Sequence, residues 1–567
     1  MARLDRIGPM AKEVAQVGAA IGREFSYDLL AAVARRSDSE LRVALDRLIS
    51  AGLVFGRGEV TDASFLFKHA LVQDAAYGTL LRSQRRELHA RIALLLEERL
   101  ATGGQEQPEI LAHHCGHAGL IEKAVYYWQQ AGERSKARSA MTEAIRQMRK
   151  ALDMLSHLPD TPGRQRTEIE LQLALGGALI AAKGHADEET GKAYARARHL
   201  SELQNDSPNL LKALWGEFVH YHVRGEPDRS HPIAEELLGL AGRQSDAAIL
   251  VAGHRAVGDS WLHRGQLALA RAHLERGLAL YDPAQQRSLT ALFAENGRVA
   301  MLSFLSLTLG LLGFADQARV QSDNALAEAR ELSHPISLAF ALSVACRLHF
   351  VLEDPLTVGR RAEELIALTT EQRFAFFLAM GTTYRGWTLV EADDIEAGMD
   401  LLRRGIEGFQ ASGAAWILPF YLAQLATAYA KTARFENGLS QLSDALALTE
   451  KSGVRWFEAE LHRRRGELLL TARSGAEAEA ESEFRHAIAI ARQQEAKLWE
   501  LRSAVSLARL WRDQGKREAA CGLLAPVYGW FSEGFDTSDV RNGKALLEEL
   551  GRGGATPRSA RAATRSP

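Results

Sequence analysis

A repeat of about 40 residues runs through the second half of this chain and constrains the fold more than any other feature of the sequence. Small residues recur at that spacing in one column, which consists of Ser306, Cys346, Gly386, Ala426 and Gly466. Two further columns of small residues keep the same phase, and they consist of Ala318, Gly398 and Gly438 and of Ala325, Gly405 and Ala445. Helices approach closely only where side chains are short, so these columns predict helix contacts. A fixed period of this length is typical of a solenoid, in which stacked helix pairs bury a shared core.

Each repeat is predicted to be two helices joined by a short break. The breaks recur at Gly184, Gly225, Gly265, Gly313, Asp354, Asp393, Ala433, Ser474-Gly475 and Gly515. The predicted fold is all-α, a superhelix of helix hairpins that occupies residues 109–535. A terminal helix over 536–550 is expected to cover the last exposed apolar face, as open solenoids require. Residues 551–567 combine glycine, proline and arginine without an acidic residue, which is typical of a disordered tail.

Residues 1–80 do not follow the repeat and predict a smaller, separate domain. Two helical patterns precede a third helix, which begins at the capping sequence Ser37-Asp38-Ser39-Glu40. Apolar runs on either side of Gly56–Gly58 then predict a β-hairpin. Three helices followed by a hairpin is the element order of a winged-helix-like domain. Residues 81–108 are expected to form a connecting helix and a polar linker to the array.

A winged helix has two common uses, and the sequence leaves both open. One is DNA binding, for which Arg42 and Arg47 would lie near the helix that faces the groove. The other is packing against protein, which is favoured because Glu40 and Asp46 occupy the same helix and no basic run accompanies it. The alternative function of the whole chain is therefore a transcriptional regulator whose winged helix binds DNA and whose array senses a signal.

Composition and charge exclude several classes of protein. With 69 basic and 71 acidic residues, the net charge argues against a general binder of nucleic acid or anionic membranes. Three dispersed cysteines are too few for a disulfide framework, which favours a reducing cytoplasm. Two uncharged runs, 299–315 and 408–430, are interrupted by polar residues and keep the phase of the repeats. We expect them to be buried solenoid helices and not membrane spans.

No catalytic, cofactor or metal site is predicted. Three glycine–lysine pairs occur, but none is followed by the serine or threonine of a phosphate-binding loop. His113 and His117 lie one helical turn apart, yet Cys115 between them occupies an apolar column of the repeat and is expected to pack. The segment Gly258-Asp259-Ser260 follows no strand and is not a nucleophile elbow. His263 on the same helix is expected to have no paired acid in a strand-rich pocket.

Aromatic and basic residues recur along the first helices of the repeats, which solenoids present on a concave wall. Tryptophan and arginine are suited there to grip a peptide or protein segment. The predicted partner groove consists of Trp387, Arg385, Arg463, Arg464 and Arg465. Three other tryptophans share one phase of the repeat and are expected to pack between repeats, namely Trp416, Trp456 and Trp499.

The repeat pattern resembles tetratricopeptide repeats (TPRs) in a longer form. The small-residue columns, the glycines at the breaks and units such as Gly258…Trp261…Gly265…Ala270…Gly277-Leu278 carry the resemblance over about residues 109–531. The standard unit has about 34 residues, so the extra length implies longer helices. The resemblance implies a TPR-like α-solenoid that binds a protein or peptide partner on its concave face.

A narrower resemblance is to bacterial multidomain signalling ATPases of the STAND type, above all those that also carry a class III adenylate/guanylate cyclase domain. It is carried by the segments IGREF at 21–25, GLV at 52–54, FKHALVQDAAY at 67–77 and LAHH at 111–114. In that family the winged helix links an ATPase module to a sensing repeat array, so the resemblance implies a cyclase or ATPase module as a candidate partner.

The chain departs from that family because it has neither the phosphate-binding loop nor the metal-binding segments of the cyclase. Cyclase and ATPase activity are therefore not carried over. We expect either a separated sensor half or a chain whose activity is supplied by another polypeptide. The expected function is a non-catalytic protein-interaction and regulatory module in bacterial signal transduction.

Overall fold

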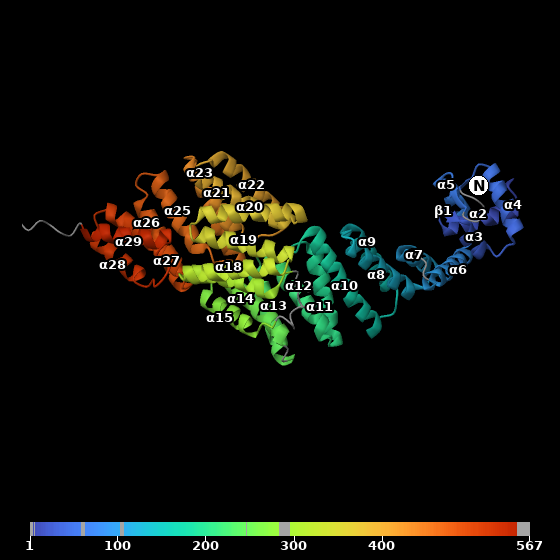
Figure 1. The fold of residues 1–567 in the computed structure, drawn as a ribbon, viewed down its shortest axis with the longest axis horizontal. Coiled ribbons are helices and arrows are strands. Elements are labelled where there is room, and N and C mark those ends of the chain that lie inside the picture. The colour runs from blue at the N-terminus through green and yellow to red at the C-terminus, as the bar shows by residue number, and fades with distance from the viewer. Residues whose placement is uncertain are drawn as a thin grey trace, which may run out of the picture. The chain divides into compact units, whose positions relative to one another are not determined.

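The computed structural model describes most of the chain (Figure 1); the described residues are 4, 6–57, 63–102, 107–244, 247–282 and 295–552. Of the predicted tail at 551–567, only residues 551 and 552 fall within these ranges, and they end a helix. The chain divides into two compact units, one of residues 1–182 with 199–206 and one of residues 183–198 with 207–567. Each unit has hydrophobic core clusters of its own.

The first unit begins with a small domain of three helices and a three-stranded sheet. Its elements are α2 (Pro9–Ile21), β1 (Glu24–Ser26), α3 (Tyr27–Ala34), α4 (Asp38–Ser50), β2 (Val54–Arg57) and β3 (Ser64–Phe67). The sheet is antiparallel in the order β1-β3-β2, with Phe25 opposite Phe65 and Val54 opposite Phe67. The predicted order of three helices and a hairpin is confirmed. Strand β1 escaped prediction because three residues are too few for an alternating pattern.

The third helix, α4, begins at the predicted capping sequence. The hydroxyl of Ser37 accepts a hydrogen bond from the backbone N–H of Glu40 at 3.4 Å, and the Glu40 carboxylate accepts one from the N–H of Ser37 at 3.0 Å. This capping box satisfies two backbone donors that the first turn of a helix leaves unpaired. The sequence therefore specifies where the helix starts.

The first unit continues with paired helices. They are α5 (Ala70–Gly78), α6 (Arg82–Ala101), α7 (Pro108–Ala118), α8 (Ile121–Ala137), α9 (Met141–Ser156) and α10 (Pro162–Lys183). The core of the small domain extends through Leu88 and Ile92 of α6 to Leu111 of α7. Nε of Arg86 also donates to the carbonyl of Ala118 at 2.8 Å. The helix predicted as a connection thus packs directly against the first helix predicted for the array.

The second unit is a TPR-like α-solenoid of helix pairs (Figure 1). Its helices are α11 (Glu188–Gln204, shared with the first unit), α12 (Ser207–Val223), α13 (Pro227–Gln244), α14 (Ala247–His263), α15 (Leu267–Leu280), α17 (Gly297–Leu312), α18 (Ala315–Glu331), α19 (Pro335–Val351), α20 (Pro355–Gln372), α21 (Ala375–Glu391), α22 (Ile395–Ala411), α23 (Leu418–Lys431), α24 (Phe435–Ser452), α25 (Glu458–Ala472), α26 (Glu477–Gln493), α27 (Lys497–Asp513), α28 (Arg517–Tyr528) and α29 (Ser538–Arg552). Helix α29 occupies the place predicted for a terminal helix.

The predicted breaks between paired helices are confirmed by the backbone. A residue in the left-handed region of φ stands at each break, and these residues are Gly184, Gly225, Gly265, Gly313, Glu353, Asp393, Ala433, Gly475 and Gly515. A left-handed residue ends a helix because it turns the chain away from the helical path. Glycine adopts this conformation without steric cost, which explains its frequency here.

The small-residue columns mark backbone contacts between helices. A methyl group added at Gly398 would lie 2.7 Å from the carbonyl oxygen of Gly386, and one added at Gly386 would lie 2.8 Å from the carbonyl oxygen of Gly398. Gly405 is equally close to the carbonyl of Ala379, at 2.9 Å. Helices α21 and α22 therefore approach so closely that only glycine fits, as the repeat pattern predicted.

Segments far apart in the sequence also bind each other through their backbones within the second unit. The carbonyl of Val223 at the end of α12 accepts a hydrogen bond from the N–H of Ala415 at 2.9 Å, and the carbonyl of His263 at the end of α14 accepts one from Arg455 at 2.8 Å. Trp416 and Trp456 follow those donors and are buried. Earlier repeats thus meet later repeats, and the expectation that these tryptophans pack between repeats is confirmed.

The two uncharged runs belong to this packed core. Nearly every side chain of α17 is buried, and α23 buries Phe420, Tyr421 and Leu425 among others. Within the described ranges, none of the helices combines the length and the apolar character that crossing a membrane requires.

Candidate partner-binding site

A cavity of about 510 Å³ opens between the helices of the later repeats in the second unit. Helices α19, α21, α23 and α25 supply most of its lining. The rest comes from Glu353 in the turn before α20, Pro355 of α20 and Leu442 of α24. The lining residues are Phe350, Glu353, Pro355, Trp387, Glu391, Ala423, Ala426, Thr427, Ala430, Leu442, Arg463, Arg464, Glu467, Leu468 and Thr471. The first helices of successive repeats thus form most of its wall.

The apolar part of the wall is built on two aromatic rings. Trp387 and Phe350 pack with their centroids 4.6 Å apart, and Phe350 also meets Phe420 edge-on at 4.7 Å. Trp387 is only 5% exposed, so neighbouring side chains hold most of its surface. A fixed aromatic wall favours binding because little rotational freedom is lost when a ligand arrives.

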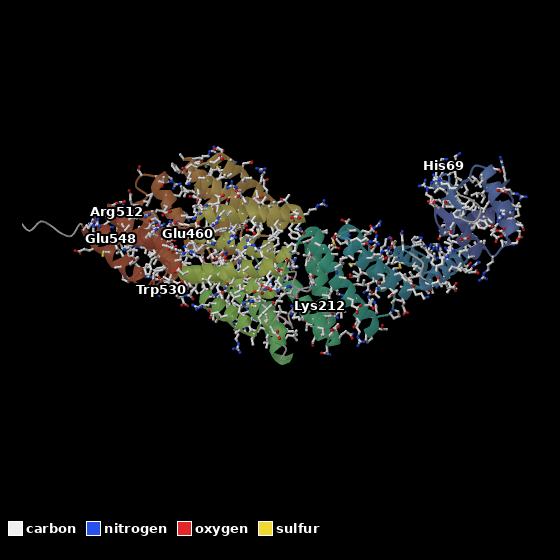
Figure 2. The ribbon with its side chains drawn as sticks, in the orientation of Figure 1. His69, Lys212, Glu460, Arg512, Trp530 and Glu548 are labelled. Atoms are coloured by element: carbon white, nitrogen blue, oxygen red, sulfur yellow. The ribbon has the colours of Figure 1, made fainter. Side chains whose placement is uncertain are left out.

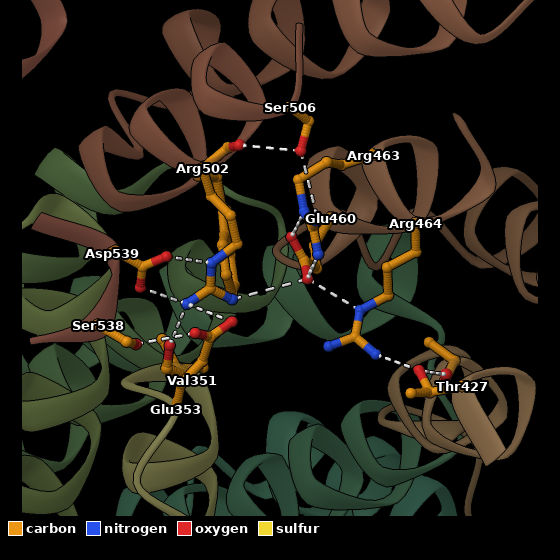
Figure 3. Close-up of polar contacts among 12 residues, drawn as sticks. Val351, Glu353, Thr427, Glu460, Arg463, Arg464, Arg502, Ser506, Ser538 and Asp539 are labelled. Carbon is orange, nitrogen blue, oxygen red and sulfur yellow. Dashed lines mark hydrogen bonds and ion pairs between the residues drawn. The ribbon is translucent and has the colours of Figure 1, made fainter. Parts of the chain in front are cut away.

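A buried carboxylate organises the charged part of the wall. Glu460 on α25, labelled in Figure 2, is fully buried. It accepts two hydrogen bonds from Arg463 at 2.7 Å and one from Nε of Arg464 at 2.8 Å (Figure 3). Burial opposes ionisation of Glu460, but the arginines outweigh it and hold the pKa of the carboxyl well below its usual range. The same contacts raise the pKa of Arg463. These residues therefore stay charged and hold one another in place.

Arg502 extends this network beyond α25. Its guanidinium lies 3.6 Å from Glu460 and 3.6 Å from Glu353, and it donates to the carbonyl of Val351 at 2.9 Å (Figure 3). It also binds Asp539 on α29, with Nε 2.7 Å from Oδ1. Four helices and one turn thus meet at a set of mostly buried ions, of which Glu353, Arg463 and Arg464 line the cavity.

The structure brings together three of the five residues predicted for the partner groove. Trp387, Arg463 and Arg464 line the cavity. Arg385 instead forms an ion pair with Glu363 at 3.2 Å, and Arg465 forms one with Glu483 at 3.4 Å; neither arginine lines the cavity. Successive residues of a helix point about 100° apart, so three adjacent arginines cannot share one face. The sequence alone did not resolve which of them face the cavity.

The charges that face solvent at the cavity are mainly acidic. The side chains of Glu353 and Glu467 are 41% and 43% exposed and that of Glu391 is 30% exposed. Arg463 and Arg464 are 8% and 15% exposed. The sequence analysis missed these carboxylates, since Glu353 was seen only as a turn residue and Glu391 carries no distinguishing pattern.

Arg464 is the cation most accessible from the cavity. Its Nε binds Glu460, one terminal nitrogen donates to the hydroxyl of Thr427 at 2.6 Å, and the guanidinium lies 5.6 Å from the ring centre of Phe350. Figure 3 shows it reaching from α25 towards α23. These contacts hold the side chain in one position, so a ligand would meet both its positive charge and its fixed surface.

The histidines noted in the sequence form a second cluster, which lies in the first unit. His89 of α6 and His114 of α7 are buried with their Nδ1 atoms 2.8 Å apart, and the rings of His113 and His117 lie 4.4 Å apart. Cys115 packs against Ala93 and Ala124, and burial raises the pKa of its thiol to about 11. The expectation that Cys115 packs as a small apolar residue is confirmed.

Comparison with known proteins places the chain beside helical-repeat proteins of low sequence identity. No family model matches it. An uncharacterised protein of Rhizobium meliloti (strain 1021) is 26% identical over 518 residues, which cover 90% of this chain and 49% of that protein. The chain therefore spans about half the length of the curated relative it matches.

Similar solved structures include a STAND protein with a tetratricopeptide repeat sensor from Pyrococcus horikoshii, at 12% identity and a TM-score of 0.28, covering 97% of this chain and 66% of that one. They also include a Rap protein complexed with competence and sporulation factor, at 12% identity and a TM-score of 0.42, covering 70% of this chain and 99% of that one. The apo form of RapI matches 51% of this chain and 98% of its own, at 12% identity and a TM-score of 0.41.

Proposed function

We propose that the chain is a non-catalytic interaction and regulatory module whose array captures a segment of a partner protein. The observation that carries this proposal is the cavity between α19 and α25, with its fixed aromatic wall and its carboxylates at the mouth. A concave, mainly apolar pocket with a few placed polar groups is the usual form of a binding site. Buried aromatic and arginine side chains are also the residues that dominate binding energy at interfaces.

The charges of the cavity favour a basic partner segment. The carboxylates of Glu353, Glu391 and Glu467 each have a cationic partner but stay 30–43% exposed. Arg463 and Arg464 are only 8% and 15% exposed and are bound to Glu460. A lysine or arginine of the partner could lay its apolar stem along the ring wall and bring its charge to the carboxylates. We therefore propose an amphipathic peptide segment with basic residues as the ligand.

The regulatory part of the proposal is supported by sequence. The segments in the first unit resemble STAND-type signalling proteins, and the curated relative is about twice as long as the matched region. We propose that the array is the sensor of a system that includes a nucleotide-cyclase or ATPase module, in the same polypeptide or in another. A cytoplasmic location belongs to this proposal, since the three cysteines are free thiols.

A selection of displayed random peptides on the purified, immobilised chain tests the site. We expect enriched peptides to combine lysine or arginine with apolar residues, and we expect Glu391→Lys to weaken their binding about tenfold or more through like-charge repulsion. Glu363→Lys is the matched control, because Glu363 is exposed on α20 and does not line the cavity. Enrichment of acidic peptides, or equal losses in the two variants, would contradict the proposal.

The first unit is better suited to bind protein than DNA. Arg42, which a DNA-binding winged helix would direct to the groove, donates to Asp38 at 2.7 Å and lies over the ring of Tyr27. Apolar side chains are exposed nearby in the sequence, with Val43 47%, Ile49 41% and Phe55 49% exposed. We propose that this winged-helix-like domain packs against another protein module, as exposed apolar side chains favour.

A further inference from the structure

Two histidines and an aspartate converge in the interior of the second unit, away from the cavity lining. Asp259 and His263 lie one turn apart on α14, and His222 comes from the last turn of α12. Nε2 of His222 lies 3.4 Å from one carboxylate oxygen of Asp259, and Nδ1 of His263 lies 3.0 Å from the other. One ligand atom from each residue lies within 4.8 Å of those of the other two. The sequence analysis considered only an acid in a strand-rich pocket, whereas His263 is paired with an acid on its own helix.

The cluster is buried and leaves polar atoms without partners. His263 is 2% exposed and Asp259 is 6% exposed, while the side chain of His222 is 10% exposed. Among the described residues, Nε2 of His263 has no hydrogen-bond partner, while its Nδ1 also lies 2.9 Å from the carbonyl oxygen of Asp259. Oδ1 of Asp259, which faces His263, also makes no hydrogen bond to the described residues. Buried polar atoms are nearly always satisfied, so an unsatisfied carboxylate oxygen inside the cluster indicates a missing group.

We infer that His222, Asp259 and His263 bind a divalent transition-metal ion, with Zn²⁺ as the first candidate. Imidazole nitrogens and a carboxylate oxygen are the donors that Zn²⁺ and its neighbours prefer. Bonds of about 2.0–2.1 Å in tetrahedral geometry place ligand atoms about 3.3 Å apart. The separations of 3.0 and 3.4 Å in this cluster are close to that spacing but involve different oxygens of Asp259. One ligand atom of each residue lies within 4.8 Å of the others, so the side chains would turn and draw together around the ion.

Two arginines carry positive charge near the cluster, and their charge bears on which fourth ligand an ion would take. The positive charges of Arg255 and Arg347 both disfavour protonation of His222. Arg255 is itself paired with Glu295. In the described part of the chain, both terminal nitrogens of Arg347 lack hydrogen-bond partners. A divalent ion with a single carboxylate ligand keeps a net positive charge, so the fourth ligand is expected to be a small anion, such as chloride or hydroxide. Such an anion would also offset the positive charge of Arg347.

The ion would link two consecutive repeats at the place where segments from later repeats form backbone hydrogen bonds with them. Helices α12 and α14 supply the ligands, and the two helix ends beside them accept the backbone hydrogen bonds of Ala415 and Arg455. Both His222 and His263 also pack on the indole of Trp416, at 5.8 and 4.8 Å between ring centres. The site is therefore a structural metal site that links two repeats, and it is separate from the proposed peptide cavity.

Metal titration of the purified full-length chain, first stripped with a chelator, tests the inference. We expect one Zn²⁺ or Co²⁺ per chain at this site, the visible absorption of tetrahedral Co²⁺, and a rise in the thermal midpoint on adding Zn²⁺, because an ion that binds only the folded state stabilises it. His222→Gln and Asp259→Asn should each weaken Co²⁺ binding by about a hundredfold or more and abolish the rise.

His254→Gln is the matched control, since His254 lies on the same helix α14 but faces His273, with their Nδ1 atoms 3.1 Å apart. It should leave the Co²⁺ spectrum unchanged. Circular dichroism establishes that each variant keeps its helices. The inference is overturned if the unmodified chain shows neither the Co²⁺ spectrum nor the thermal shift, or if His222→Gln and Asp259→Asn bind Co²⁺ as tightly as the unmodified chain.

Discussion

The guanidinium of Arg502 forms a bidentate ion pair with the carboxylate of Asp539: Nε lies 2.7 Å from Oδ1, and a terminal nitrogen donates to Oδ2. Both residues are buried, at 5% exposure each. The pair ties the terminal helix α29 to α27, and through the carbonyl of Val351 it reaches the end of α19. The last helix is therefore held by a charge pair in the core as well as by its apolar face.

Removing one partner of this pair should cost far more stability than removing both. Arg502→Met leaves the carboxylate of Asp539 buried without its cation, and we expect the free energy of unfolding to fall by about 3–5 kcal/mol. The double variant Arg502→Met/Asp539→Leu should recover part of that loss, because two apolar side chains then replace two charges. Urea unfolding of the three proteins measures the coupling. Additive losses would show that the two side chains act independently.

The contact between α21 and α22 predicts opposite effects for two glycine substitutions. Gly398→Ala forces a methyl group against the backbone of α21, and we expect it to lower the free energy of unfolding by about 1–3 kcal/mol. At Gly359 on α20 the nearest atom to an added methyl group is 3.9 Å away. Gly359→Ala should therefore stabilise the protein by up to about 1 kcal/mol through helix propensity. Thermal unfolding of both variants measures these changes in stability. Equal effects of the two substitutions would contradict the close approach of α21 and α22.

These glycines also show why the sequence predicted so much of the fold. A close contact between helices that are neighbours in the chain leaves a local signature, so Gly386 and Gly398 recur in the repeat and the breaks carry residues that tolerate positive φ. The contacts between Val223 and Ala415 leave no such mark, because backbone atoms of distant repeats make them. Trp387 was recognised as a wall residue by its residue type, whereas Glu391, one turn further along the same helix, resembles any exposed glutamate in the sequence.

The histidine cluster of the first unit should make stability depend on pH. Burial, reinforced by neighbouring histidines, lowers the pKa of both His89 and His114 to about 3. The unfolded chain takes up these protons near pH 6.5, so the stabilisation is complete above that pH and is lost as the pH falls towards 3. At pH 5 the loss is about 1–2 kcal/mol for each histidine.

Hydrogen exchange of α6 and α7 at pH 5 and pH 7.5 measures this loss. His114→Asn should flatten the pH dependence, because the variant no longer buries an ionisable ring at that position. His157→Gln is the control, since His157 is exposed at the end of α9. If both variants kept the pH dependence of the original chain, the buried histidines would not be its source.

The charge arrangement on α4 predicts that the chain does not bind duplex DNA. Arg42 donates a hydrogen bond to Asp38. Asp46 and Arg47 are adjacent and both exposed, so the negative charge of Asp46 offsets the positive charge of Arg47. We expect no retardation of a random-sequence duplex in a gel at low salt, where phosphate contacts are strongest. A retarded band that weakens with salt and disappears in Arg42→Ala/Arg47→Ala would instead favour the transcriptional regulator.

The proposed peptide site should lose affinity as salt is added. Its solvent-facing charges are carboxylates, so attraction for a basic peptide is screened once the Debye length falls to about 3 Å near 1 M salt. Peptides selected on the chain should therefore bind more weakly at high salt, mainly through slower association. Trp387→Leu should weaken binding at every salt concentration and leave the salt dependence intact, because the indole supplies apolar surface and not charge. Fluorescence anisotropy of a labelled peptide separates the two terms; affinity that rises with salt would mean that the cavity binds its ligand by apolar contact alone.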